Sequence, residues 1–379
     1  MLRVRMASGC EVFTMPMEEL REMLGGEPVK ALKQQLQQVC GEPRFKQRLL
    51  LEDGRPLDDA ASLQEPLELQ LVVLCGFSGT SQAQVNELVE EAHQNRTLEV
   101  EQLLHRPQDP DLATVTGWTP LLTSSVQGHL EVARLLLEAR AAVDKSLPNG
   151  ASPLLAASEN GHVAMAQLLL TSCSKIDGAM RNGETPLYMA SQNGHLEVAR
   201  LLLCSRADIS RTRMDGSTPL QAATESARIG IARLLLDARA DIDLADVIGC
   251  TPLIKAVIEG HADVAEFLLA ARAAVDKSLP NGASPLLAAS ESGHVAIARE
   301  LLQLCADVDK ALLSGETPLF MASQNGHVEV AHLLLEVKAD FSISRTDGIT
   351  PLRVARQRGH LDIVALLESS SKNALLSPR

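Results

Sequence analysis

Histidine is the side chain most often used to bind metals or to move protons near neutral pH, and this chain has ten. Seven recur at one position of a 33-residue period: His129, His162, His195, His261, His294, His327 and His360. One imidazole per layer is too far from the next for two rings to share an ion, whose ligands lie about 2 Å away. We therefore interpret these rings as structural groups that bond to backbone at the start of a helix.

The cysteines give no further sign of a reactive centre. They are odd in number, widely spaced and without a Cys-x-x-Cys pair: Cys10, Cys40, Cys75, Cys173, Cys204, Cys250 and Cys305. This pattern argues against a disulfide framework or zinc site and predicts buried thiols in a reducing compartment. No nucleophile-elbow, zinc-protease or phosphate-loop signature occurs. The sequence thus predicts no catalytic residue, no metal, no cofactor and no enzyme, with the cytoplasm, or alternatively the nucleus, as the location.

The formal net charge of −13 bears on the class of partner. Sequence-independent binding to nucleic acid needs clustered Lys and Arg, and anionic membranes repel an acidic surface. No stretch approaches the roughly 18 apolar residues of a membrane span, and the alternating start of the chain does not resemble a signal peptide. We expect protein partners, and neither nucleic acid nor a membrane span.

The elements that position these side chains follow a strict period. Glycines recur every 33 residues: Gly117, Gly150, Gly183, Gly216, Gly249, Gly282, Gly315 and Gly348. Two residues after each comes Thr-Pro or Ser-Pro, and nine residues later Gly-His, except for Ala227-Arg228 in the fourth unit. Thr or Ser can cap the start of a helix, and proline suits the first turn of that helix. The later glycine suits the left-handed backbone conformation at the end of the helix. A second helix with apolar residues at helical spacing then follows, as at Val132, Leu135 and Leu136.

This unit resembles the ankyrin repeat over residues 111–370, which gives eight repeats. The resemblance implies a mainly α solenoid of helix-turn-helix units with β-turn tips. Residues 82–110 fit a degenerate capping repeat, and 371–379 a disordered tail. In the family motif a His follows Thr-Pro-Leu and forms hydrogen bonds between repeats. The resemblance does not imply these bonds here, because other residues occupy that position: Leu122, Leu155, Tyr188, Gln221, Ile254, Leu287, Phe320 and Arg353.

A longer period of 132 residues, or four repeats, is also present. Residues 139–159 are identical to 271–291, and 183–203 nearly match 315–335. Two interpretations stay open. The block is either a recent duplication without a selected role, or it provides two copies of one binding surface about 40 Å apart, which could hold a dimeric or repetitive partner with avidity.

Residues 1–75 lack the period and predict short strands around one helix. Strands are expected at Leu2 to Met6, Val12 to Met15, Gln47 to Leu51 and Leu67 to Val73, with Asp53-Gly54 as a turn. Pro28 opens a helix with an apolar stripe at Val29, Leu32, Leu36 and Val39. An extra turn spans Met17 to Gly26, and 76–81 reads as a linker.

This order resembles ubiquitin, a small α+β β-grasp domain. Val29-Lys30-Ala31, Gln47-Arg48-Leu49 and Leu67-Glu68-Leu69 carry the likeness. The chain continues into Cys75-Gly76-Phe77 without a terminal diglycine, so conjugation is not expected. The resemblance places ubiquitin's apolar recognition patch at Leu50 and Gln70, where the Gln weakens it. A domain that only caps the array and a domain that acts in the ubiquitin pathway both remain open.

In such a solenoid the turn tips and the outward ends of the first helices stay free and line a concave groove. Exposed apolar tips favour a protein partner, and the basic Arg211 and Arg213 suit an acidic peptide. The candidate residues are Leu147, Met180, Arg181, Arg211, Arg213, Met214, Asp246, Val247, Ile248, Leu279 and Leu313, with Gln192, Asn193, Glu225 and Ile258 from the first helices. We expect a protein or extended peptide across the tips of repeats three to six.

Two functions remain open on this basis. The first is a non-enzymatic protein-interaction scaffold. The alternative is a ubiquitin-pathway adaptor, in which the N-terminal domain docks on proteasome or ligase machinery and the repeats select cargo. They differ in whether residues 1–75 bind ubiquitin receptors.

Overall fold

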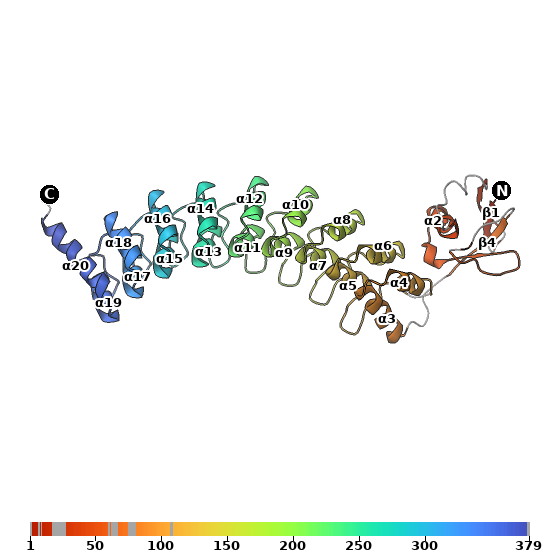
Figure 1. The fold of residues 1–379 in the computed structure, drawn as a ribbon. Helices are drawn as coiled ribbons and strands as arrows, with labels where there is room; N and C mark the ends of the chain where they lie inside the picture. Colours follow the sequence, from red (N-terminus) through yellow and green to blue (C-terminus); the bar gives the residue numbers. More distant parts are fainter. Residues whose placement is uncertain are drawn as a thin grey trace. The chain divides into compact units, whose positions relative to one another are not determined.

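A computed structural model describes residues 2–6, 8, 10–16, 28–59, 61, 67–74, 81–106 and 109–376 (Figure 1). The chain divides into two compact units, residues 1–175 and 176–379, and each is described by itself. The turn predicted at Met17–Gly26 and residues 76–80 of the predicted linker lie outside the described residues.

The first unit begins with a four-stranded sheet and one helix. The strands are β1 (Leu2–Met6), β2 (Glu11–Met15), β3 (Gln47–Leu50) and β4 (Leu67–Val73), in the order β2-β1-β4-β3. The central pair β1 and β4 is parallel, and the outer pairs are antiparallel. Helix α2 (Pro28–Cys40) packs on the sheet, and its apolar stripe is buried except for Val39. This is the β-grasp arrangement that the sequence predicted.

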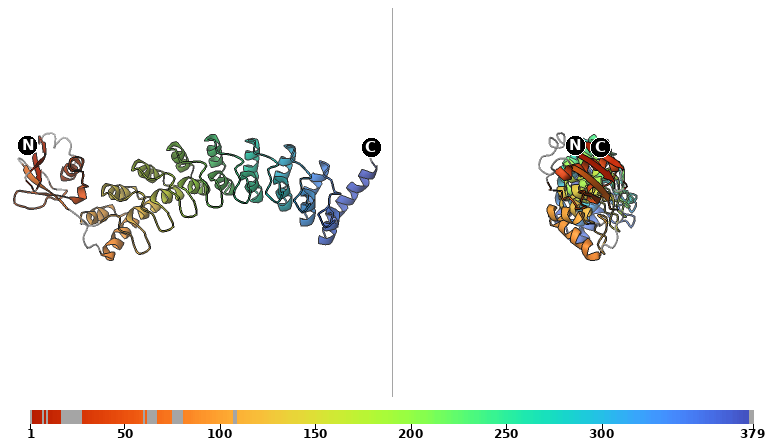
Figure 2. Two further views of the ribbon diagram at one scale, coloured as in Figure 1. Left: turned by 180° about the vertical axis from the view of Figure 1, so that it is seen from behind. Right: turned by 90° about the vertical axis from the view of Figure 1, so that its right-hand side faces the viewer.

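Pairs of short helices follow. In the first unit they are α3 (Gln82–His93), α4 (Thr97–Leu104), α5 (Pro120–Gln127), α6 (Leu130–Glu138), α7 (Pro153–Glu159) and α8 (Val163–Thr171). In the second unit they are α9 (Pro186–Asn193), α10 (Leu196–Cys204), α11 (Pro219–Glu225), α12 (Ile229–Asp237), α13 (Pro252–Ile258), α14 (Ala262–Ala270), α15 (Pro285–Ser292), α16 (Val295–Gln303), α17 (Pro318–Asn325), α18 (Val328–Glu336), α19 (Pro351–Arg358) and α20 (Leu361–Leu376). Within each unit the first helices of the pairs form one row and the second helices another (Figure 2).

The third repeat shows why these residues form a helix pair. The Thr185 hydroxyl accepts a hydrogen bond from the Tyr188 N–H at 3.2 Å, and proline occupies the first turn. Gly194 ends α9 with φ +88°, a left-handed conformation that only glycine adopts without strain. Val198 and Leu202 then bury the inner face of α10. The local sequence therefore sets both helices and the turn between them.

Five of the recurring histidines each bond to the pair of helices that comes before. The His327 ring bonds through Nε2 to the Glu291 carbonyl at 2.9 Å, and the same bond recurs from His129, His162, His261 and His360. The His327 ring lies so close to Gly293 that a Cβ there would fall 2.5 Å from Nδ1. In the fourth repeat Arg228 replaces the histidine and donates to the Gln192 carbonyl at 3.4 Å. These bonds confirm the structural role predicted for His129, His162, His261, His327 and His360.

A recurring aspartate supplies a second bond between repeats. Asp243 accepts the Ala274 N–H at 2.9 Å, and Asp309 accepts the Asp340 N–H at 2.9 Å. A third bond between repeats comes from Gln221, the residue that follows Thr-Pro-Leu in its repeat. Its side-chain amide donates to the Cys250 carbonyl at 2.6 Å. Gln221 therefore makes a bond between repeats from the very slot where the motif's histidine is missing.

Two expectations need correction. Cys250 is buried, but Cys10, Cys173, Cys204 and Cys305 are exposed and Cys40 is half-buried, so the prediction of buried thiols is wrong for these five. Cys173, Cys204 and Cys305 lie where a second helix ends, outside its apolar face. Cys75 lies outside the described residues.

The second correction concerns the C-terminal tail. Helix α20 continues to Leu376, so the disordered tail predicted for 371–379 is wrong for 371–376, and 377–379 lie outside the described residues. Buried Ile363 and Leu367 anchor the start of this helix, from which it extends without a break.

Candidate partner-binding surface

The tips of the second unit are held in register by backbone hydrogen bonds. The N–H groups of Met214, Val247 and Leu313 donate to carbonyls of the preceding tips at 2.8 to 2.9 Å. The slot between them holds Pro280, which has no N–H to donate. Because the three residues occupy the same slot of their repeats, their side chains form a row along one edge of the unit.

Four apolar tip side chains project from this edge into solvent. Met214 is 76% exposed, Val247 71%, Ile248 61% and Leu313 80%. Ile258, at the end of the first helix α13, is also exposed. Exposed apolar side chains on a backbone held by hydrogen bonds make this edge the candidate for partner binding.

Other predicted apolar tips contribute less. Leu279 is half-buried because it packs on a cluster that includes Leu287 and Phe320. Met180 is also half-buried. Leu147 is half-buried and belongs to the first unit.

Asp246 does not belong to the binding surface, contrary to the prediction. Its carboxylate is buried and accepts the N–H groups of Ile248 at 3.1 Å and Cys250 at 2.8 Å. Lys255 lies 3.7 Å away. Asp246 therefore closes its own turn and fixes the tip that carries Val247 and Ile248.

The two arginines of the predicted basic spot, Arg211 and Arg213, differ in their contacts. Arg213 lies 3.5 Å from Glu184 and 3.6 Å from Asp215, and its hydrogen bond with Tyr188 is the main reason that its pKa lies above the ordinary value. Arg211 is exposed and forms no ion pair among the described residues. Arg181 is likewise exposed. A partner would thus meet Arg211 more readily than Arg213.

The candidates on the first helices lie at the helix ends. Glu225 and Ile258 are exposed, and Gln192 and Asn193 are half-buried. The carbonyls of Gln192 and Glu225 already accept the bonds from Arg228 and His261. The fold therefore uses the backbone of these residues, while the side chains of Glu225 and Ile258 face solvent beside the tips.

The structure also brings together charged residues that sequence reasoning missed. Arg44, in the short 3-10 helix η1 (Arg44–Lys46), is fully buried within the first unit. Its guanidinium lies 2.7 Å from Glu101, 2.7 Å from Glu138 and 3.0 Å from Asp59. Glu101 and Glu138 belong to α4 and α6, so this arginine joins the β-grasp domain to the first repeats.

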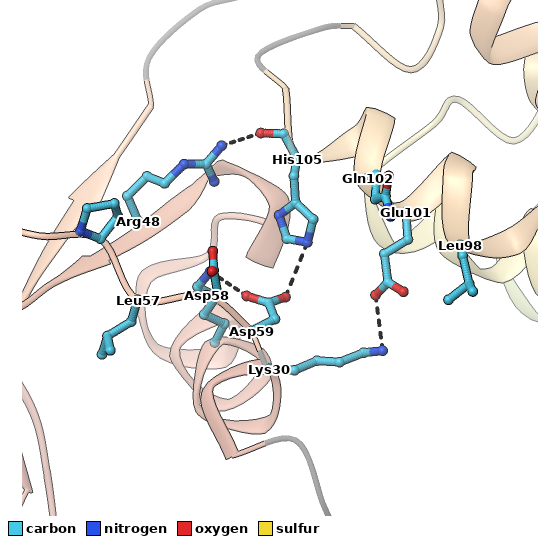
Figure 3. A pocket seen from close by; sticks show the side chains of 11 residues that line it. Lys30, Arg48, Leu57, Asp58, Asp59, Leu98, Glu101, Gln102 and His105 are labelled. Carbon is cyan, nitrogen blue, oxygen red and sulfur yellow. Dashed lines mark hydrogen bonds and ion pairs between the residues drawn. The ribbon is translucent and has the colours of Figure 1, made fainter. Parts of the chain in front are cut away.

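Further charges surround an adjoining pocket of about 620 Å³ (Figure 3). Lys30 lies 3.0 Å from Glu101, and His105 lies 3.3 Å from Asp59. Arg48 donates to the His105 carbonyl. The pocket is lined by Lys30, Lys33, Arg48, Pro56, Leu57, Asp58, Asp59, Leu98, Glu101, Gln102 and His105. Several of these charged groups pair with one another, Lys30 with Glu101, and Lys33 and His105 with Asp59.

The pairing shifts two acids in the same direction. Burial alone would raise the pKa of Asp59, but hydrogen bonds from His105 and Lys33 hold it far below its usual range. Burial likewise opposes ionisation of Glu101, while Lys30 and Arg44 bring its net pKa below the ordinary value. Both carboxylates are therefore charged at neutral pH.

The predicted ubiquitin-like surface is open to solvent at one of its two residues. Leu50 and Gln70 stand opposite each other on β3 and β4, and both point away from α2. Leu50 is half-buried and Gln70 is exposed. Arg48, two residues earlier on the same face, contacts the array.

Two other features are absent from the described part of the chain. It contains no group of three or more His, Cys, Asp and Glu side chains placed to hold a metal ion. Among these residues we also found no helix both long and apolar enough to cross a membrane.

Comparison with known proteins identifies the repeats. The family model for ankyrin repeats in three copies matches overlapping segments at 88–179, 139–213, 171–246, 207–279, 240–312, 270–345 and 286–375. No family model matched the N-terminal sheet, and a search of curated proteins found no match. Ankyrin repeats indicate a protein-interaction scaffold, and such modules are typically not catalytic. Because the matches span 88–375, the chain belongs to the ankyrin-repeat family.

Proposed function

We propose that this protein is a scaffold that holds a protein partner across the tips and first-helix ends of repeats three to seven. The observation that carries the proposal is the row of exposed apolar tips at Met214, Val247 and Leu313, whose backbone is fixed by hydrogen bonds between tips. A rigid surface loses little conformational entropy on binding, so its exposed apolar area contributes more fully to affinity. A cytoplasmic location, with exposed free thiols in a reducing environment, belongs to the same proposal.

The test compares three forms of the full-length chain as bait in an extract of its own cells. One carries Met214→Ser, Val247→Ser and Leu313→Ser. The matched control carries Leu304→Ser and Val337→Ser, which also remove exposed apolar side chains but lie at the ends of second helices. Proteins kept by the wild type and the control, and lost by the tip variant, support the proposed surface. Identical retrieval by all three would overturn it.

Arg211→Glu tests the basic spot separately. Arg211 is the better site for charge reversal, because Arg213 also holds its own turn through Glu184 and Asp215. Loss of an acidic partner, with circular dichroism unchanged, supports a role for this cation. Unchanged binding removes Arg211 from the site.

A second candidate function, as an adaptor of the ubiquitin pathway, has one observation in its favour. The β-grasp sheet presents Leu50 and Gln70 as a cross-strand pair on the face away from α2. The test measures binding of the full chain to purified proteasomal ubiquitin receptors, beside a Leu50→Glu variant. Binding that the variant loses supports the adaptor. Absence of binding by the wild type leaves the scaffold with the N-terminal domain as a cap.

A further inference from the structure

A small pocket lies between the first helices α3 and α5 of the first unit. Its volume is about 320 Å³. It is lined by Val89, Glu90, His93, Trp118, Thr123, Val126 and Gln127. Trp118 is the only tryptophan in a chain with 2% aromatic residues. The chain therefore places its largest side chain at the wall of a surface pocket rather than in the core.

The polar groups of the walls are largely bonded within the fold. The Thr123 hydroxyl donates to the Thr119 carbonyl at 3.0 Å. The carbonyls of His93 and Val126 accept bonds from the rings of His129 and His162, each at 2.9 Å. What the pocket offers a ligand is therefore the apolar surface of the valines, the tryptophan ring and one carboxylate, beside the side chains of His93 and Gln127.

That carboxylate belongs to Glu90 and lies at the exposed rim. Gln94 donates to one of its oxygens, and among the described residues the other oxygen accepts no hydrogen bond. None of the seven lining residues is Lys or Arg. Helices α3 and α5 both end here, at His93 and Gln127, and the C-terminal end of a helix carries partial negative charge. The local potential thus favours a cation.

We propose that this pocket takes a lysine or arginine side chain from a protein partner. The aliphatic stem packs on Val89 and Val126, the cation lies against the Trp118 ring, and its charge meets Glu90. A purely apolar side chain would leave the carboxylate unmatched, and an acidic one would be repelled. The proposal rests on the scaffold function and adds a site of defined chemistry, apart from the tips of the second unit.

Because Trp118 is the only tryptophan, its emission reports directly on the pocket. The full-length chain is titrated, into the millimolar range, with short Ala and Ser peptides that differ at one central position. That position is Lys, Arg, norleucine or Glu. Norleucine keeps the aliphatic stem without the charge. We expect a saturable change in emission with the Lys and Arg peptides. The norleucine peptide should bind about fivefold more weakly, and the Glu peptide should not change the emission.

Two variants locate the effect. Glu90→Gln should remove the preference for Lys over norleucine, and Glu99→Gln, an exposed carboxylate on α4 outside the pocket, should keep it. Trp118→Ala, followed by the anisotropy of a labelled Lys peptide, should weaken binding by roughly fivefold to thirtyfold. Equal binding of Lys and norleucine, a preference that survives Glu90→Gln, or unchanged Trp118 emission would each overturn the proposal.

Failure of this proposal is distinguishable from failure of the scaffold function. If the tips of the second unit bind partners and the peptides do not bind near Trp118, only the pocket proposal is wrong. If the peptides bind and no partner depends on the tips, the tip surface is wrong and the pocket stands.

Discussion

Contacts between neighbouring repeats recur every 33 residues, whereas the contact between the β-grasp domain and the first repeats is built around one buried arginine and occurs once. In the repeats, a histidine ring covers a glycine and bonds to a carbonyl, as His327 does at Gly293 and Glu291. At the N-terminal contact, the buried Arg44 is surrounded by Asp59, Glu101 and Glu138. Repetition spreads stability over many small contacts, while a unique contact concentrates it in one residue.

The largest effect is expected from Arg44→Met. Removal of the guanidinium takes the cation from Glu138 and leaves Glu101 with Lys30 alone, which should cost about 3 kcal/mol of the free energy that holds the β-grasp domain on the repeats. Hydrogen exchange of α2 and α4 measures it. Arg55→Met is the control, because its pair with Asp53 is exposed and should contribute little. Equal exchange in wild type and Arg44→Met would show that the ionic contact does not hold the domain.

The repeat contact can be broken by Gly293→Ala. The new Cβ must fit a left-handed backbone and displace the His327 ring, so we expect a loss of about 2 to 3 kcal/mol in the free energy of unfolding. Gly359→Ala has a similar φ of +80° and nothing within 4 Å of its Cβ, and should cost only about 1 kcal/mol. Urea unfolding compares the two. Equal losses would mean that the ring does not contribute.

Acid should weaken the ionic contact between the β-grasp domain and the first repeats. The pKa values of Asp59 and Glu101 are depressed in the folded state. Their contribution, about 2 kcal/mol, is fully present above the unfolded-state pKa near 4 and is lost progressively as the pH falls through the depressed folded-state values. Thermal unfolding of wild type and Arg44→Met should therefore differ at neutral pH, and the difference should narrow as the pH falls below about 4. A constant difference would contradict the assignment.

The smallest effect, and the only gain in stability, is expected from Arg239→Gly. Arg239 follows α12 with φ +68°, and glycine relieves this strain while losing a cation at a helix end. The net gain should be about 0.5 kcal/mol after the greater entropy of the unfolded chain is subtracted. Arg233→Gly, inside the same helix, should instead lose about 1 kcal/mol. A melting temperature that moves in the same direction for both would refute this explanation.

The repeats were predictable because each recurring residue acts on the backbone within a few residues of itself. Thr185 caps α9 and Gly194 ends it within a few residues of chain. The aspartate slot was missed, although it carries a signal, since the carboxylates recur at the same period as the glycines: Asp111, Asp144, Asp177, Asp243, Asp276 and Asp309. The binding surface was predicted only in part. Asp246 has the polarity of an exposed tip, and only its bonds to Ile248 and Cys250 show that it closes the turn.

The sequence by itself determined the helix pairs, the spacing of the tips and the role of the histidines, because caps, glycines and apolar spacing act within a single unit and then repeat. Tertiary structure alone decided which tips remain exposed, where Trp118 forms a pocket, and that Arg44 meets Glu101 and Glu138. These features depend on side chains that are far apart in the chain and occur once. A single charge carries no period, so its partners are defined only when folding brings them within bonding distance.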